Sequence, residues 1–425
     1  MNIWTLAKAA AVGLAVSFVA DIWAVTPYEE IKQVPERAAG IYHAYPVTET
    51  RNTPPPSGFK PVYISHMGRH GSRYLLRQWE YDDMRTLLDA AHDAGALTEA
   101  GERVRDDFMV VYDEADGHAG DLSPLGVRQH QGIAERMYTA YPEVFGDFRK
   151  VNAVSTMIMR CGMSMAAFCG QLKEMNPKLD ISLDPSERHM RYIMYNSDGM
   201  KAYNSDAGPW KEEYRKLREK WIPTDRIMDM IFADSVYVRR HVNPVEFVWM
   251  LYNVASNMQN VENPRPFMDL FTHDELYSLW RTENFRMYAH YSTYAPAGDV
   301  VISSSKPLLR KILEQADVSL AAGNVAADLR FGHDINIIPL AGLMGLQGCS
   351  PVVNDPEVVH EVFQDYNFSP KASNIQLIFF RNGSGEVIVK FMLNEREIAI
   401  PCKTDIYPFY KWIDVKEYYT GILGE

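Results

Sequence analysis

Strand-like segments lie at both ends of this 425-residue chain, and a long helical stretch separates them. Between about residues 177 and 290 the pattern is helical, rich in aromatic and charged residues, with few strand signals. Strands gathered from the two ends of a chain around a helical middle predict one α/β sheet domain that carries a helical insertion. We therefore expect an α/β core over residues 25–176 and 291–425, and an inserted helical region over 177–290. The apolar runs that we expect to be strands are residues 61–67, 151–157, 298–304, 326–334, 374–382 and 386–393.

Local signals place turns and helix ends within this layout. Ser123 is a good N-cap and Pro124 suits the first helical position, so a helix is expected to begin there. Further helical patterns cover residues 84–94, 102–114 and 160–172. The polar, proline-rich residues 25–60 indicate an extended arm. Residues 382–385, Asn-Gly-Ser-Gly, predict a hairpin turn between the last two strands.

The first 24 residues resemble a secretory signal peptide. Lys8 precedes an apolar run from Ala9 to Ala20, and Asp21 ends the run before it reaches the length of a membrane span. Cleavage after Ala24 is plausible; a buried helix or a membrane anchor is the alternative. We expect a secreted or periplasmic protein with no stable membrane span once the signal is removed.

Charge and cysteine usage narrow the functional classes. Lys and Arg number 43 and Asp and Glu 55, for a net charge of −12. An acidic chain is a poor nucleic-acid binder, so no nucleic-acid partner is expected, and an anionic ligand would need a local cluster of arginines. The cysteines show no zinc spacing. An oxidising compartment permits a Cys349–Cys402 bridge, and the alternative is that these two, Cys161 and Cys169 are all free thiols.

The run Arg69-His70-Gly71-Ser72-Arg73 follows the first expected strand directly. Ligands of open α/β sheets bind at the carboxyl ends of strands. Arginine forks match phosphate oxygens, and two flanking positive charges disfavour protonation of the histidine between them. A neutral imidazole nitrogen is a nucleophile. The pattern indicates phosphoryl transfer to His70, against the alternative of a surface loop with a chance basic run.

Two further elements extend this candidate site. Arg160 follows the second expected strand, and Gly332-His333-Asp334 ends a later one. A histidine and an acid at a strand end could contact a phosphate and protonate a leaving oxygen. A second His-Asp pair, His273-Asp274, lies in Thr-His-Asp-Glu, which is a capping box before a helix, so we interpret it as structural.

These motifs together resemble the histidine acid phosphatases. Residues 69–73 resemble the family signature, and residues 122–126, Leu-Ser-Pro-Leu-Gly, with Gln129 resemble its common helix start. Arg160 and His333-Asp334 fall, in family order, where that family has its third phosphate arginine and its carboxy-terminal dipeptide. Residues 372–401 resemble the multiple inositol polyphosphate phosphatases and their bacterial relatives. The resemblance implies a phosphoglycerate-mutase-like three-layer α/β sandwich with a helical insertion domain.

By this resemblance, His70 would form a phosphohistidine and Asp334 would protonate the leaving alcohol. Arg69, Arg73, Arg160 and His333 would hold the phosphate, with no metal and no cofactor. Two positions depart from the family pattern: Leu75 stands where a proline is usual, and His-Asp replaces the His-Ala-Glu usual in inositol polyphosphate phosphatases. Phosphoglycerate mutases usually continue their motif as Gly-Glu-Thr, so they are a weaker match.

The functional hypothesis is a secreted, metal-independent phosphomonoesterase that acts on small phosphate esters, with inositol polyphosphates including phytate favoured. A broad-specificity histidine acid phosphatase is the nearest alternative. A non-catalytic phosphate-binding protein of the same fold is the alternative from another class. Arg188, His189 and Arg191 are candidate cations for a polyanionic substrate, although a solvated helix face is the simpler interpretation of them.

Overall fold

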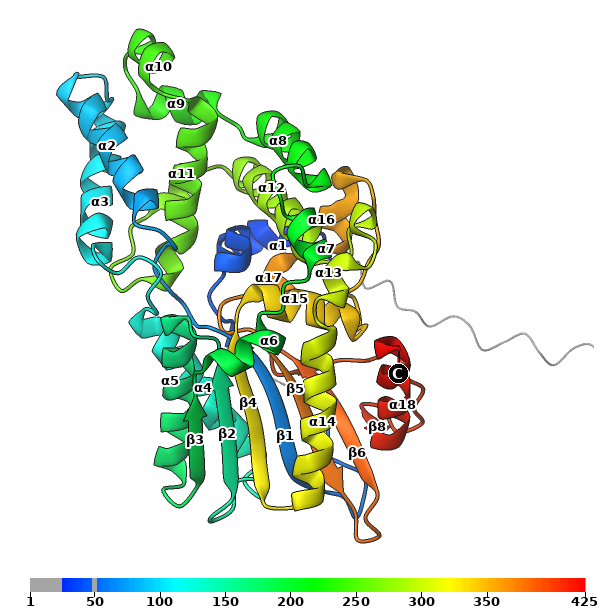
Figure 1. Cartoon of the computed structure of the whole chain (residues 1–425). Coiled ribbons are helices and arrows are strands. Elements are labelled where there is room, and N and C mark those ends of the chain that lie inside the picture. Colours follow the sequence, from blue (N-terminus) through cyan, green and yellow to red (C-terminus); the bar gives the residue numbers. More distant parts are fainter. Residues whose placement is uncertain (1–24, 48–51, 425) are drawn as a thin grey trace, which may run out of the picture.

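The computed structural model describes residues 25–47 and 52–424, so the predicted signal peptide lies outside the described residues. Figure 1 shows a sheet flanked by helices in one half of the molecule and a group of helices in the other. The strands are β1 Lys60–Arg69, β2 Lys150–Ser155, β3 Asp180–Asp184, β4 Val325–Gly332, β5 Asn374–Arg381, β6 Val387–Leu393, β7 Arg396–Glu397 and β8 Phe409–Lys411.

The helices account for most of the remaining chain. The α-helices are α1 Pro27–Gln33, α2 Trp79–Asp93, α3 Glu99–Ala115, α4 Pro124–Ala140, α5 Met159–Met175, α6 Met190–Ile193, α7 Asp198–Tyr203, α8 Pro209–Trp221, α9 Asp225–Ile231, α10 Ser235–His241, α11 Pro244–Asn257, α12 His273–Tyr291, α13 Val300–Ser303, α14 Lys306–Ala322, α15 Asp334–Leu343, α16 Val359–Val362, α17 Asp365–Phe368 and α18 Trp412–Leu423. The 3₁₀ helices are η1 Pro35–Tyr42, η2 Glu187–His189, η3 Met258–Asn260, η4 Phe267–Leu270, η5 Ala295–Ala297 and η6 Pro356–Val358.

The sheet has the strand order β3-β2-β4-β1-β5-β6-β7, and β8 pairs with β6. β1 is parallel to β4 and antiparallel to β5, so it lies inside the sheet. The expected β5–β6 hairpin is confirmed, and Asn382 closes its turn by accepting a hydrogen bond from the Ser384 N–H. The interior position of β1 explains why seven of its ten residues are buried.

Helices cover both faces of the sheet, which confirms the predicted α/β sandwich. On one face, Ile133 of α4 and Phe168 of α5 belong to a core cluster with Ile64 of β1. On the other, Ile312 of α14 and Tyr419 of α18 belong to a cluster with residues of β1, β5 and β6. Ser123 caps α4 as expected, accepting a hydrogen bond from the Gly126 N–H.

The helical half contains more of the chain than the 177–290 segment. Apolar side chains of α2 and α3 share one core cluster with those of α9, α11 and α12. Figure 1 shows α2 and α3 beside α11, away from the sheet. Conversely, part of the predicted insertion belongs to the sheet: β3 lies within residues 177–290 and pairs with β2. The capping box at Thr272 and Glu275 is present, so the structural interpretation of His273-Asp274 is confirmed.

Two local predictions were wrong. Residues 25–60 were expected to be an extended arm, but α1 and η1 form within them, because Thr26 caps α1 and prolines occupy the first turns of both helices. Residues 298–304 were expected to be a strand, but they contain α13. A short apolar run fits either structure, and here Val301 is buried among helical residues such as Phe285 instead of pairing with a strand.

All four cysteines are free thiols, so the alternative of a Cys349–Cys402 bridge is not realised. Within residues 25–47 and 52–424, none of the helices combines the length and apolar character needed to cross a membrane.

Candidate active site

The site lies where β1 and β4 end side by side. Arg69 is the last residue of β1 and pairs with Gly332, the last residue of β4. The His70 N–H donates to the Gly332 carbonyl at 2.9 Å. The rings of His70 and His333 are therefore neighbours, with 5.5 Å between their centroids. Parallel pairing thus brings together two motifs that are more than 260 residues apart in the sequence.

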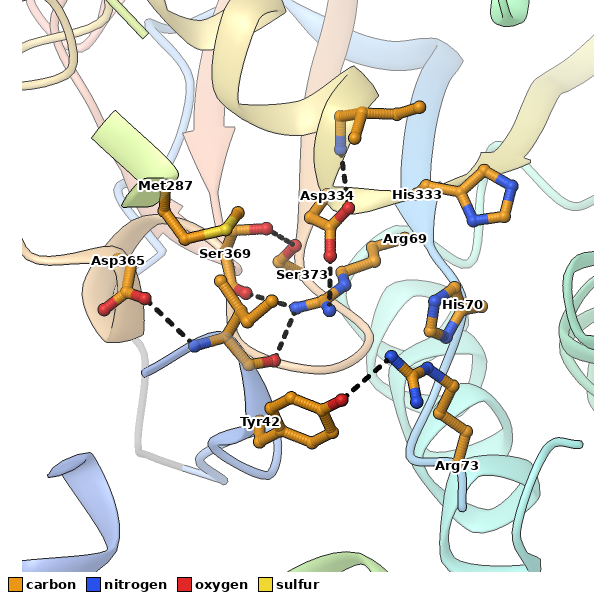
Figure 2. A network of polar contacts seen from close by, with 12 residues as sticks. Tyr42, Arg69, His70, Arg73, Met287, His333, Asp334, Asp365, Ser369 and Ser373 are labelled. Carbon is orange, nitrogen blue, oxygen red and sulfur yellow. Dashed lines mark hydrogen bonds and ion pairs between the residues drawn. The ribbon is translucent and has the colours of Figure 1, made fainter. Parts of the chain in front are cut away.

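Arg69 is fully buried, and three different segments fix its guanidinium (Figure 2). Its Nη1 donates to the carbonyl of Ile41 at 2.8 Å and to the carbonyl of Ser369. Its Nη2 donates to Asp334 Oδ2 at 2.7 Å. These contacts preorganise a cation at the strand end, where an anion would be bound without further reorganisation.

Arg73 and Arg160 complete the cationic group at the strand ends. Arg73 Nη1 donates to the carbonyl of Tyr74 at 2.7 Å, and its Nη2 lies 3.4 Å from the Tyr42 hydroxyl. Arg160 lies in the first turn of α5, and its Nη1 contacts the Gly120 carbonyl at 3.4 Å. Arg73, Arg160 and His333 all line one pocket with His70 and Asp334.

His70 is held in the form that a nucleophile needs. Its Nδ1 lies 2.9 Å from the carbonyl of Gly71, which can only accept a hydrogen bond, so Nδ1 carries the proton and Nε2 keeps its lone pair. Burial lowers the pKa of His70 well below the usual range, and the charge of Arg69 lowers it further. The ring therefore stays neutral in the free protein at mildly acidic pH.

His333 and Asp334 follow β4 and have different environments. Burial and the charge of Arg160 lower the pKa of His333 to about 3, and its Nε2 lies 3.3 Å from the Thr156 hydroxyl. Burial raises the pKa of Asp334, but the positive charge of Arg69 and its neighbours outweighs that effect, so the pKa falls well below its ordinary value. Asp334 is consequently a carboxylate in the free protein.

The start of α4 supports the loop that carries the arginines. Ser72 donates its N–H to Gln129 Oε1 at 2.8 Å, and its carbonyl accepts from the Ser123 N–H at 2.9 Å. A Cβ on Gly71 would lie 2.5 Å from the Gly126 carbonyl oxygen, so this approach requires glycine. The Leu-Ser-Pro-Leu-Gly segment therefore acts as a support for residues 69–73.

The pocket has a volume of about 740 Å³ and is lined by residues of the strand ends and of the helical half. Beyond the predicted residues it presents two further arginines, Arg77 and Arg286, and two carboxylates, Glu80 and Glu283. Its aromatic walls are Tyr42, Trp79, Tyr214, Trp249 and Tyr291. The pocket thus has a cationic base at the strand ends and a mixed-charge, aromatic mouth.

Sequence reasoning missed several residues of this site. Arg188, His189 and Arg191 do not line the pocket, and Arg188 and His189 instead pair with Asp184. Tyr42 lies in the supposed extended arm, and Arg286 lies on a helix without a motif. Lys371 directly precedes residues 372–401, the run that resembles the inositol polyphosphate phosphatases. This position is the one sequence signal that pointed to Lys371.

No group of three or more His, Cys, Asp or Glu side chains suited to a metal ion occurs in the described part of the chain. The charges next to His70 come instead from the guanidinium groups of Arg69 and Arg160.

Comparisons with known proteins agree with this fold. The chain is 22% identical over 400 residues to multiple inositol polyphosphate phosphatase 1 of Gallus gallus, covering 87% of this chain and 83% of that protein. Its fold is similar to that of the Bifidobacterium longum multiple inositol polyphosphate phosphatase in complex with phosphate, with a TM-score of 0.78, 15% identity, and coverage of 89% and 97% of the two chains. The same bacterial protein in complex with inositol hexasulfate gives a TM-score of 0.72 at 16% identity over the same shares of the two chains.

The phytase from D. castellii is also similar in fold, with a TM-score of 0.70, 16% identity, and coverage of 91% of this chain and 85% of that one. A family model matches residues 64–394, which include the strand ends with His70 and Asp334 and most of the helical half. The chain therefore belongs to the histidine phosphatase superfamily, branch 2.

Proposed function

We propose that this protein is a metal-independent phosphomonoesterase that works through a phosphohistidine at His70, with inositol polyphosphates including phytate as its favoured substrates. The observation that carries the proposal is the free Nε2 of His70 at the base of a pocket formed with Arg73, Arg160 and Asp334, directly beside the buried Arg69. The N-terminal 24 residues support action outside the cytoplasm, in the periplasm or the medium.

The reaction follows from these positions. His70 Nε2 attacks phosphorus, the bond from phosphorus to the ester oxygen breaks, and its electron pair stays on the leaving oxygen. Asp334, once protonated, gives that oxygen its proton. A water molecule then attacks the phosphohistidine, Asp334 takes a proton from the water, and His70 is restored as phosphate leaves. Arg69, Arg73, Arg160 and His333 contact the phosphate oxygens throughout.

Asp334 must carry a proton to act as the acid, and substrate binding explains how it gains one. Asp334 is ionised in the free protein because the neighbouring arginines stabilise its charge. A phosphate dianion adds negative charge to the same group of arginines and raises the proton affinity of Asp334. At mildly acidic pH the ester also arrives partly protonated, since its second pKa is about 6. The proton therefore reaches Asp334 with the substrate or as a result of its binding.

The preference for inositol polyphosphates rests on the pocket and on the relatives. A volume of about 740 Å³ accommodates a substituted six-membered ring, and Arg77 offers a cation beyond the reacting phosphate, while Arg286 is ion-paired with Glu283. The Gallus gallus relative is named for inositol polyphosphates, and the Bifidobacterium longum protein binds inositol hexasulfate. A broad-specificity acid phosphatase is the second candidate, favoured by the carboxylates Glu80 and Glu283 in the pocket.

The test is phosphate release from phytate and from p-nitrophenyl phosphate at mildly acidic pH in excess EDTA. Wild type should release phosphate from both and prefer phytate, while His70→Ala should lose at least 1,000-fold in kcat/KM on either substrate. His92→Ala, at a partly exposed histidine far from the pocket, is the matched control. Comparable rates on both esters would favour the broad-specificity candidate, and wild-type rates in His70→Ala would exclude the mechanism.

A non-catalytic phosphate-binding protein would need neither a nucleophile nor an acid. Rapid acid quenching after mixing with ³²P-labelled phytate should trap acid-labile label on wild type but not on His70→Ala. Binding of phytate by wild type without any turnover or label would support the non-catalytic alternative.

A further inference from the structure

Lys371 is a buried lysine next to the nucleophile that the proposed reaction does not use. It lies in the turn between α17 and β5 and is fully buried. Its N–H donates to the His43 carbonyl at 2.8 Å, and the next N–H, of Ala372, donates to the His70 carbonyl at 3.0 Å. The backbone of this turn is therefore joined directly to the backbone of the nucleophile.

The ammonium group of Lys371 has no hydrogen-bond partner among the described residues. Its Nζ instead lies 4.2 Å from the ring centroid of Tyr42. Arg73 contacts the same ring, with 5.1 Å from its Cζ to the centroid. Tyr42 and Arg73 both line the pocket, so Lys371 lies directly behind the pocket wall. A buried polar group that lacks a partner is costly, and such groups in native proteins call for an explanation.

The charges around Lys371 are strongly unbalanced. The charges of Arg69 at the end of β1 and of Arg73 in the loop after it act on Lys371. Arg160 of α5 and Asp334 of α15 also act on it, while Tyr42 of η1 offers only its ring. Burial lowers the pKa of Lys371 well below its ordinary value, and the arginine charges lower it further. In the free protein, three guanidinium groups oppose a proton on Lys371, and one carboxylate, that of Asp334, favours it.

A bound phosphate changes this balance. A phosphate dianion at Arg69, Arg73 and Arg160 adds two negative charges to the group that Lys371 faces, which favours the protonated lysine. We propose that Lys371 is a proton-linked binding residue: it takes a proton from solvent when a phosphate group binds, so that phosphate affinity depends on pH through this side chain. No bond forms between Lys371 and the substrate, and the Tyr42 ring stabilises the new ammonium charge. The inference rests on the proposed function only in placing phosphate at the strand ends.

The test is calorimetric titration of the whole protein with inorganic phosphate between pH 6 and 10, in pairs of buffers with different ionisation enthalpies. Above pH 8 phosphate is a dianion and His70 is neutral, so neither contributes protons. Wild type should take up as much as one proton per phosphate bound. Its affinity should weaken tenfold per pH unit between the pKa of Lys371 in the free protein and the higher pKa of Lys371 in the phosphate complex.

Variants separate this role from a packing role. Lys371→Met preserves length and packing, and should bind more weakly, without the proton uptake and with no tenfold slope above pH 8. Lys371→Arg keeps a permanent charge, and should bind without proton uptake at every pH above 8. Lys390→Met removes another fully buried lysine, one whose Nζ is hydrogen-bonded to Glu397, and should leave the uptake unchanged.

The outcomes distinguish failure of this inference from failure of the proposed function. Phosphate binding by wild type with no proton uptake at any pH would overturn the role of Lys371 and leave the phosphatase mechanism intact. The same would follow if Lys371→Met took up protons as wild type does. Absence of phosphate binding by wild type would overturn both.

Discussion

Arg69 and Asp334 form an ion pair at the centre of the site, with 2.7 Å between Nη2 and Oδ2. The arginine side chain is fully buried, and the aspartate side chain is 17% exposed toward the pocket. A phosphate that binds Arg69 must therefore share this guanidinium with the carboxylate. In the proposed mechanism, the cation that binds the substrate and the acid that protonates the product alcohol are thereby coupled.

Replacing Asp334 by Asn should slow the hydrolysis of esters with poor leaving groups most. Without the acid, an alkyl phosphate such as an inositol phosphate must lose an unprotonated alkoxide, and we expect kcat to fall about 100- to 10,000-fold. p-Nitrophenyl phosphate has a good leaving group, so kcat for this ester should fall much less. Steady-state rates on both esters provide the measurement, and equal slowing of the two would remove Asp334 from the acid role.

Gly40 tests how Arg69 is positioned. It has φ 55° and ψ −122°, and a Cβ there would lie 2.5 Å from Asp365 Oδ2. Because the next residue, Ile41, supplies a carbonyl to Arg69, Gly40→Ala should displace that carbonyl and raise KM for phosphate esters about tenfold. Gly298→Ala is a close control, since Gly298 has φ 56° and ψ −128° with open space around it. Both variants share the backbone strain, so equal kinetic effects would contradict the positioning role.

Asp365 should make stability depend on pH. Its oxygens accept from the Ile41 N–H and from Trp280 Nε1, and burial raises the pKa of its carboxyl to about 7. The folded state therefore retains a proton that the unfolded state loses near pH 4, and stability falls as pH rises from about 4 to 7. The loss is about 4 kcal/mol at most, at about 1.4 kcal/mol per pKa unit.

Denaturant unfolding at several pH values between 4 and 8 measures this effect. In Asp365→Asn, the free energy of unfolding should fall less as the pH rises from 4 to 7. The variant should therefore gain stability relative to wild type over this range, even if the substitution changes stability by a constant amount at every pH. Asp206→Asn, at a fully exposed aspartate, controls for removal of a charge elsewhere. Parallel pH profiles for wild type and Asp365→Asn would exclude Asp365 as the source.

Glu80 should limit affinity for highly charged substrates. It lines the pocket, and its carboxylate accepts from the Arg77 N–H at 2.7 Å, a contact that a glutamine oxygen can keep. Glu80→Gln should lower KM for phytate about 3- to 10-fold at low salt and change KM for p-nitrophenyl phosphate less. Added salt should shrink the difference. Asp83→Asn is the control, because Asp83 lies outside this pocket. An unchanged KM for phytate in Glu80→Gln would contradict the prediction.

The strand ends could be predicted from sequence because each motif follows an apolar strand directly. Arg69-His70 after β1 and His333-Asp334 after β4 converge once those strands are parallel neighbours, and Arg160 follows β2, the next strand along. Periodicity, Ser123 and the Asn-Gly turn likewise located α4 and the β5–β6 hairpin. In each case the signal lies within one short segment, and strand pairing then brings the segments together.

The missed residues depend on contacts between distant segments. Tyr42 and Ile41 reach the site because η1 packs beside α12 and α17, which no local pattern within residues 25–60 reveals. Asp365, the first residue of α17, and Lys371, in the turn before β5, are both buried, although charged residues are usually exposed. The run at 298–304 was misassigned because β-branched residues suit a strand, while packing against α12 and α15 selects a helix.

The interior place of β1 also determines when this protein can become active during synthesis. One neighbour, β4, ends at residue 332, and the other, β5, ends at residue 381. Until the ribosome has made both, the strand that carries Arg69 has open edges, which are sites of mispairing and aggregation. The site at the strand ends can therefore assemble only once about nine-tenths of the chain is available for pairing.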